Sequence, residues 1–245
     1  MKKSIYISKL FNSILYLFKY LSTFFIIMVI TSYFQSYFKL NDDFSFSISL
    51  ILSAFCFYIL LKLENKDPIK YLNLKVFKFK YFYLITLLSL SIVLLDSTLV
   101  SILENILNIQ VPNNNSITFY SLLHIIFLAP IYEEIFFRGI ILTKLKQNFP
   151  AFIAIIFQAI IFGFFHGDVI TKILSTITGI ILGSIYNYTN NLTIVICIHS
   201  CINIFIAIFN IYSLNINPIL ATVLSGILVI ICIKKITIEK RPIIE

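Results

Sequence analysis

The sequence predicts an all-α, polytopic membrane helix bundle with about eight transmembrane helices. Of the 245 residues, 59% are apolar and only 12% are charged, whereas an ordinary soluble domain has about 25% charged residues. The apolar residues form blocks of about 20, the length that crosses a hydrocarbon core of roughly 30 Å. The blocks do not alternate apolar and polar residues, so we expect helices rather than the strands of a barrel.

Eight blocks have the composition of spanning helices. They cover residues 18–38, 44–63, 81–102, 117–143, 150–167, 169–188, 192–211 and 217–233. Five lysines lie in the connection 64–80, two more follow the fourth block, and the C-terminal tail is also basic. Lysine-rich loops stay on the cytoplasmic side of a membrane. An even number of spans therefore predicts that both termini are cytoplasmic.

The basic connection also divides the chain. Residues 1–63 are expected to form an N-terminal pair of transmembrane helices, 64–80 a basic cytoplasmic linker, and 81–245 the rest of one membrane domain. The net charge of +8 comes from lysines between apolar blocks, so we expect no nucleic-acid partner. The bias towards Ile, Lys and Asn is typical of an AT-rich genome. Together with the apolar blocks, this bias favours a bacterial protein that crosses the plasma membrane several times.

Three charges lie inside the fourth span, in the stretch APIYEEIFFRG. Each charge costs roughly 2.5–3.5 kcal/mol at the centre of a membrane helix. Glu134 and Arg138 are four residues apart, which suits an ion pair on one helix face. Glu133 points about 100° away and is left less well paired, as suits a general base. A purely structural ion pair would explain Glu134 and Arg138 but not Glu133.

Histidines lie in two further predicted spans. His166 follows Phe162 by four residues in FGFFH, and His199 precedes Asn203 by four residues in HSCIN. Each pair therefore shares a helix face. Ionisable residues inside a membrane are functional candidates, whereas the third histidine, His124, has no such partner and is expected to be structural.

A glutamate with two histidines fits two kinds of site. Glu133, His166 and His199 match the ligand set of a catalytic divalent metal such as zinc. They also match a metal-free site in which Glu and His activate a water. The spacing does not choose between them.

A Gly179 to Gly183 pattern in the sixth span allows close helix packing, although chance in an isoleucine-rich helix explains it equally well.

The three polar motifs together resemble a known family. EEIFFR, FGFFH and HSCIN read as EExxxR, FxxxH and HxxxN, in this order and on separate spans. This order is similar to that of the CAAX-protease and bacteriocin-processing family (CPBP, or Abi) of intramembrane endopeptidases. The resemblance covers about 117–211. It implies an eight-helix bundle around a conical, membrane-buried cavity that opens to the cytoplasm.

The resemblance also implies roles for the matching residues. Glu133 and His166 would activate the attacking water, and His199 and Asn203 would hold the oxyanion of the tetrahedral intermediate. The supporting members of the motifs would be Glu134, Arg138 and Phe162.

The substrate that the resemblance implies is a peptide or membrane-associated protein in the lipid bilayer. Eukaryotic members cut prenylated CAAX proteins, and bacterial members resemble peptide-processing or bacteriocin self-immunity proteins. Two rivals are a non-enzymatic immunity protein of the same fold and a proton-coupled secondary transporter. The complete motifs argue against the first, and the lack of a visible inverted repeat argues against the second.

Overall fold

The computed structural model describes residues 2–79, 82–109, 119–211 and 217–238, and within these ranges all regular structure is helical. Five helices are long and apolar enough to cross a membrane. They are α1 (Lys2–Phe38), α2 (Asp42–Leu63), α4 (Phe82–Leu107), α9 (Val169–Thr189) and α10 (Leu192–Ile211). Two further apolar helices are α8 (Ala151–Phe164) and α11 (Pro218–Ile238). The all-α membrane bundle is therefore confirmed.

The fourth predicted span is one uninterrupted helical stretch of mixed type. In order it comprises α5 (Phe119–Leu123), η2 (His124–Leu128), α6 (Ala129–Glu134), η3 (Ile135–Leu142) and α7 (Thr143–Lys146). The η segments are π-helical. Thus the Thr143 N–H bonds the carbonyl of Arg138, five residues back. Such wide turns in a longer helix are frequent at functional sites, and here they flank the EE pair.

Two helix ends differ from the predicted boundaries. The first helix begins at Lys2, not at residue 18, because a helix can continue beyond the hydrocarbon layer with polar residues. The fifth ends at Phe164, so His166 lies in the turn between α8 and α9 rather than in a span. Asp168 then caps α9 by accepting a hydrogen bond from the Thr171 N–H at 3.0 Å, which fixes where the turn stops.

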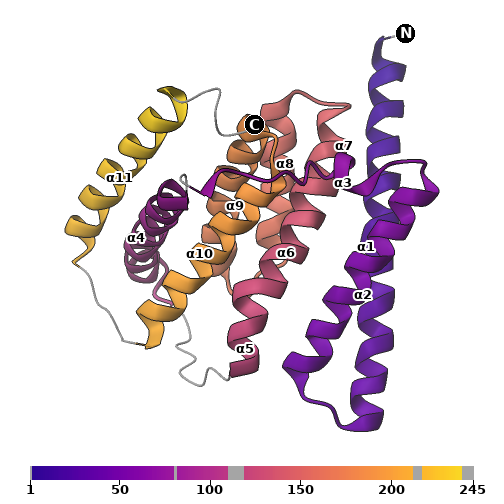
Figure 1. Ribbon diagram of the computed structural model, residues 1–245, viewed down its shortest axis with the longest axis horizontal. Coiled ribbons are helices and arrows are strands. Elements are labelled where there is room, and N and C mark those ends of the chain that lie inside the picture. The colour runs from indigo at the N-terminus through magenta and orange to yellow at the C-terminus, as the bar shows by residue number, and fades with distance from the viewer. Residues whose placement is uncertain (1, 80–81, 110–118, 212–216, 239–245) are drawn as a thin grey trace.

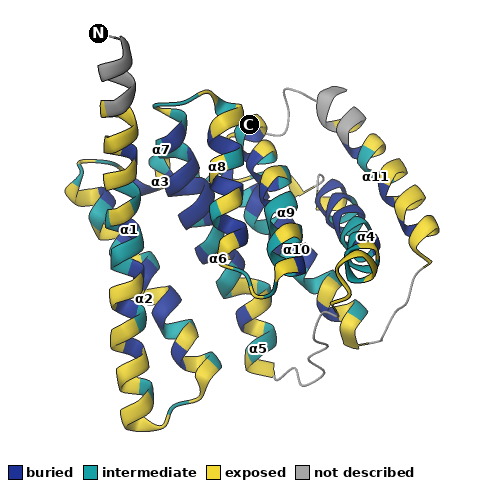
Figure 2. Cartoon of the chain, turned by 180° about the vertical axis from the view of Figure 1, so that it is seen from behind, coloured by how far each residue is buried: buried dark blue, intermediate teal, exposed yellow. Residues whose placement is uncertain are grey.

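The helices form three groups side by side (Figure 1). The antiparallel pair α1 and α2 lies on one side, and α4 and α11 pack together on the other. The helices that carry the three motifs lie between them. Among these, α8 and α9 pack closely along their length. Figure 2 shows the same order in burial, with exposed residues on the outer faces of α1 and α11 and buried residues in the centre.

Glycines explain the close packing of α8 on α9. A Cβ atom added at Gly179 would lie 3.1 Å from the Cα of Ala159, and one at Gly183 would lie 3.0 Å from Oε1 of Gln158. Side chains at these positions would push the helices apart. The small-residue pattern therefore serves helix packing, as one of its two interpretations predicted.

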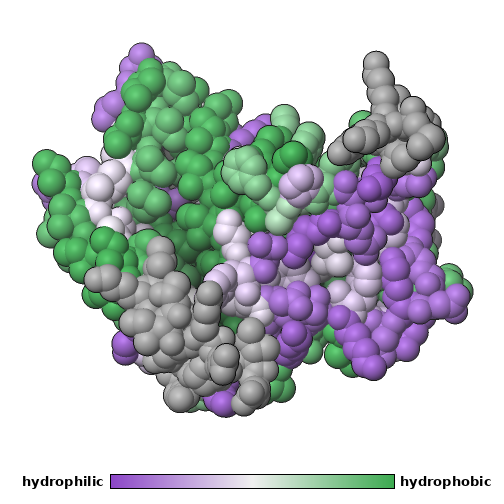
Figure 3. Space-filling view, turned by 90° about the horizontal axis from the view of Figure 1, so that it is seen from above, coloured by the Kyte–Doolittle hydropathy of each residue, from purple (hydrophilic) through white to green (hydrophobic). Residues whose placement is uncertain are grey.

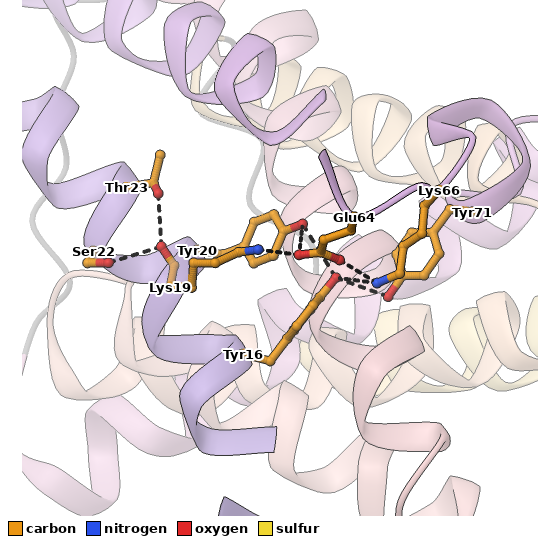
Figure 4. A network of polar contacts seen from close by, with 8 residues as sticks. All are labelled: Tyr16, Lys19, Tyr20, Ser22, Thr23, Glu64, Lys66 and Tyr71. Atoms are coloured by element: carbon orange, nitrogen blue, oxygen red, sulfur yellow. Dashed lines mark hydrogen bonds and ion pairs between the residues drawn. The ribbon is translucent and has the colours of Figure 1, made fainter. Parts of the chain in front are cut away.

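Basic segments gather at the end of the bundle that holds the N-terminus. The short helix α3 (Pro68–Tyr71) lies there, beside α1 and α7. Lys19 and Lys66 both pair with Glu64, and the Tyr16 hydroxyl lies 3.2 Å from that of Tyr71 (Figure 4). Seen from this end, hydrophilic residues form a patch beside broad hydrophobic surfaces (Figure 3). This network ties the first helix to the connection after α2.

Candidate active site

Glu134 and Arg138 form a fully buried ion pair on the mixed helix. Nη1 of Arg138 donates to Oε1 of Glu134 at 2.7 Å, as the four-residue spacing predicts. Nη2 donates to the carbonyl of Gly179 at 3.4 Å, and the guanidinium carbon lies 4.5 Å from the centre of the Phe162 ring. The two charges therefore contact each other and groups of two further helices, which offsets part of the cost of placing them in an apolar bundle, although Oε2 of Glu134 and Nε of Arg138 have no hydrogen-bond partner among the described residues.

His199 of α10 is a second partner of Glu134. Its Nδ1 lies 2.7 Å from the same Oε1 that Arg138 contacts. An ionised carboxylate can only accept, so Nδ1 carries the proton. The other nitrogen, Nε2, lies 3.8 Å from Oε2 of Glu133. The ring of His199 thus stands between the two glutamates, with its unprotonated nitrogen towards Glu133.

Glu133 and His166 line one cavity of about 80 Å³. This space is large enough to hold water. Nδ1 of His166 lies 2.8 Å from the carbonyl of Phe162. A carbonyl only accepts, so Nδ1 carries the proton and Nε2 is free to accept one. The other lining residues are apolar or aromatic: Phe24, Phe46, Leu50, Tyr132, Phe136, Phe137 and Phe165.

Phe162 joins the three motifs. Its ring lies under the guanidinium of Arg138 and its ring centroid is 4.6 Å from that of His166 and 6.0 Å from that of His199. One aromatic side chain of α8 therefore touches polar members of all three motif segments. The expected supporting position of Phe162 has a clear physical basis.

Asn203 lies apart from the cavity. Its Nδ2 donates to the carbonyl of Ile125 in η2 at 2.7 Å. Asn203 is not among the residues that line the cavity with Glu133 and His166. At least one of its two N–H groups therefore holds α10 against the mixed helix. His199 is not a lining residue either, although it lies 3.8 Å from Glu133. The structure therefore brings Glu133 and His166 to one cavity and His199 beside Glu133, and leaves Asn203 bonded to Ile125.

The fit of a metal can be judged from the donor atoms. The free Nε2 atoms of His166 and His199 have the tautomer that metal ligands need. However, no three His, Cys, Asp or Glu side chains in the described part of the chain are close enough together to hold one ion. Glu133, His166 and His199 do not converge as the ligands of a zinc ion would. The residues therefore do not fit a three-ligand metal site.

Sequence reasoning missed Tyr132. Its side chain is only 5% exposed, and its hydroxyl has no hydrogen-bond partner among the described residues. It also lines the cavity beside Glu133. The available signal was its place next to the EE pair, but an apolar helix gives no reason to separate this tyrosine from the many other aromatic residues.

His124 is held at the edge of the site region. Its Nδ1 lies 2.9 Å from the hydroxyl of Ser47 of α2, and its ring packs on Phe46. The contact joins the mixed helix to the N-terminal pair, in agreement with a structural role.

Comparison with known proteins supports the motif analysis. Residues 115–205 match the model of a family described as type II CAAX prenyl endopeptidase Rce1-like. This segment includes all three motifs and confirms the family resemblance. No curated protein and no solved structure matches the chain.

Proposed function

We propose that this multi-pass membrane protein is an intramembrane endopeptidase that cuts a membrane-associated peptide or protein. The family match supports a CAAX-type endopeptidase in general. One observation carries the proposal. Glu133 of α6 and His166 of the α8–α9 turn, 33 positions apart in the sequence (166 − 133), line the same cavity.

In the proposed reaction, Glu133 takes a proton from a water as that water attacks the scissile carbonyl. The free Nε2 of His166 accepts a hydrogen bond from the same water and orients it. Collapse of the intermediate breaks the C–N bond, and Glu133 returns the proton to the leaving amine. The apolar and aromatic side chains that line the cavity limit the access of bulk water to these groups.

His199 and Glu134 support Glu133 in this proposal. Glu134 fixes the ring of His199 through Nδ1, so that Nε2 faces Glu133 at 3.8 Å. Arg138 balances the charge of Glu134 from the same helix. The family scheme assigns the oxyanion to His199 and Asn203, but with its proton on Nδ1 the ring of His199 presents an acceptor, not a donor, towards Glu133.

The distribution of charge supports the proposed orientation. Lys19, Lys66 and Lys144 lie at one end of the bundle, around the rings of Tyr16 and its neighbours. Basic residues mark the cytoplasmic side of a membrane protein. We place this end, with the N-terminus, in the cytoplasm of a bacterial cell. Processing of a peptide is the proposed role, and self-immunity without cleavage is its rival.

A cleavage assay with a paired control tests the proposal. Wild type and Glu133→Gln are purified in detergent and incubated with a library of apolar and lipidated peptides, and products are identified by mass spectrometry. We expect products from the wild type and a rate at least about 10²-fold lower from Glu133→Gln. Asp96→Asn removes another partly buried carboxylate, one that accepts a hydrogen bond from Thr178 and does not line the cavity, and should keep the wild-type rate. Equal rates from Glu133→Gln and the wild type would defeat the assigned chemistry.

A further inference from the structure

We propose that the hydroxyl of Tyr132 donates a hydrogen bond to the oxygen of the scissile carbonyl and holds the oxyanion as it forms. The inference rests on the proposed endopeptidase function and adds a catalytic residue to it. It identifies the ligand of Tyr132 as the backbone carbonyl of a peptide.

The hydroxyl of Tyr132 is buried and is not used by the described part of the protein. The residue is nine-tenths buried and lines the cavity with Glu133 and His166, yet its oxygen has no partner among the described residues. Buried polar groups in proteins are nearly always hydrogen-bonded. Leaving one without a partner is destabilising, so a cavity-lining donor of this kind indicates that a bound molecule supplies the acceptor.

The ring of Tyr132 is held on several sides. Its centroid lies 5.3 Å from that of Phe24 in α1, 5.9 Å from that of Phe57 in α2 and 6.0 Å from that of Phe136 in η3. These contacts fix the ring without using the hydroxyl. A donor fixed in advance costs no reorganisation during the reaction, as oxyanion stabilisation requires.

The other candidate donors, Asn203 and His199, are not among the residues that line the cavity. Nδ2 of Asn203 donates to Ile125 outside the cavity, and Nδ1 of His199 is bonded to Glu134. With that tautomer, the neutral ring of His199 offers Nε2 only as an acceptor. Tyr132 is therefore the cavity-lining residue whose N–H or O–H donor is unused within the described protein.

The step balances without any further reagent. Attack transfers a proton from water to the carboxylate of Glu133 and forms a C–O bond, while the carbonyl electron pair moves onto its oxygen. The oxyanion accepts a hydrogen bond from Tyr132, which keeps its proton throughout. Collapse restores the C=O bond and breaks the C–N bond, and the proton on Glu133 goes to the amine.

The test is Tyr132→Phe, which removes only the hydroxyl. Removing one donor to an oxyanion lowers kcat by about 10²–10³-fold, so we expect that loss with KM nearly unchanged. The melting temperature should not fall, because the hydroxyl has no protein partner to lose. It is measured in detergent with a thiol-reactive dye that reports exposure of the buried Cys201 and Cys232.

Tyr20→Phe is the matched control. Tyr20 is also buried and its ring also packs on Phe57, at 5.2 Å, but its hydroxyl bonds Glu64 and Tyr16 and it does not line the cavity. It should show the reverse result, a lower melting temperature with an unchanged kcat.

The outcomes separate this inference from the proposed function. A Glu133-dependent wild-type rate with full kcat in Tyr132→Phe overturns the role of Tyr132 and leaves the endopeptidase standing. A change confined to KM, or a fall in kcat that follows a fall in melting temperature, also overturns it. If the wild type gives no Glu133-dependent products, the function and the inference fail together.

Discussion

Nδ1 of His199 lies 2.7 Å from Oε1 of Glu134, although the two residues are 65 positions apart in the chain. The contact joins α10 to the helix that carries the EE pair. Since the same oxygen also accepts from Arg138, one carboxylate fixes both a cation and an imidazole. Glu134 therefore sets the orientation of the His199 ring. The candidate base, Glu133, lies beside that ring.

The buried ion pair predicts a large effect on folding when one partner is removed. Arg138→Met leaves the charge of Glu134 inside the bundle with only His199 as partner, and should lower the free energy of unfolding by about 3–5 kcal/mol. Folded yield and melting temperature in detergent measure the loss. The double variant Glu134→Gln/Arg138→Met removes the stranded charge and should recover most of it. A double variant as unstable as Arg138→Met would contradict this account.

The two histidines should behave differently. His199→Ala leaves Glu134 with one donor fewer in a fully buried position, so we expect lost cleavage and a loss of about 1–3 kcal/mol in stability. His166→Ala removes a hydrogen bond at the end of α8, in a turn that is partly exposed. It should lose cleavage with a much smaller change in melting temperature. If His199→Ala and His166→Ala were destabilised equally, the deeper burial of His199 would not explain the effect of its removal on stability.

The close packing of α8 on α9 predicts a steric effect at Gly179. A Cβ atom there meets the backbone of Ala159 at 3.1 Å, so Gly179→Ala should destabilise the protein by about 1–3 kcal/mol. Gly226 of α11 has no atom within 4 Å of an added Cβ. Gly226→Ala should be neutral or stabilising by up to about 1 kcal/mol. Melting temperatures of the two variants test the contrast, and a stable Gly179→Ala would refute it.

Stability should depend on pH through Glu64. Burial alone would raise its pKa, but hydrogen bonds from Lys19 and Lys66 outweigh burial and hold the pKa below the ordinary value of 4.5. The stabilisation is therefore fully present above pH 4.5 and is lost as the pH falls through the lower pKa of the folded state. The melting temperature of the wild type should drop in this acid range.

Glu64→Gln separates this residue from the other acids. The difference between the wild-type and variant melting temperatures should shrink as the pH falls below 4.5. Asp67 and Asp168 also have pKa values lowered by hydrogen bonds from backbone and side-chain donors. Their contributions are the same in both proteins and therefore cancel in the difference between the melting temperatures. A difference that stays constant with pH would show that Glu64 makes no such contribution.

Cleavage should survive removal of metal ions, because Glu133, His166 and His199 do not converge on one point. Rates are compared before and after prolonged dialysis against a chelator, and again after zinc is added back. A rate that is lost on dialysis and restored by zinc would contradict this expectation and would require the three side chains to move together.

The fold was largely predictable because the membrane leaves few choices. Within the described residues, each of the eight predicted spans overlaps a helical stretch, since an apolar block of that length must satisfy its own hydrogen bonds. Helix ends were less predictable. Nothing in the apolar run before His166 marks the end of α8, and polar residues before residue 18 do not stop α1 from starting at Lys2.

Contacts within one helix were predictable and contacts between helices were not. The pairing of Glu134 with Arg138 follows from their spacing. The contacts of His199 with Glu134 and of Asn203 with Ile125 depend on how α10 is rotated and shifted against its neighbour, which spacing does not specify. The same limit applies to Tyr132, whose proposed role rests on the absence of a hydrogen-bond partner for its hydroxyl among the described residues.

The cavity beside Glu133 is closed on one side by Phe24 of α1 and Phe46 and Leu50 of α2. A peptide that reaches Glu133 from this side has to displace these side chains. Under the proposed function we expect the N-terminal helix pair to move away from the helix that carries Glu133, and lipid to yield to that movement. Under the proposed function, turnover would then vary with the lateral pressure and thickness of the surrounding bilayer, so that the membrane acts as a part of the enzyme's specificity.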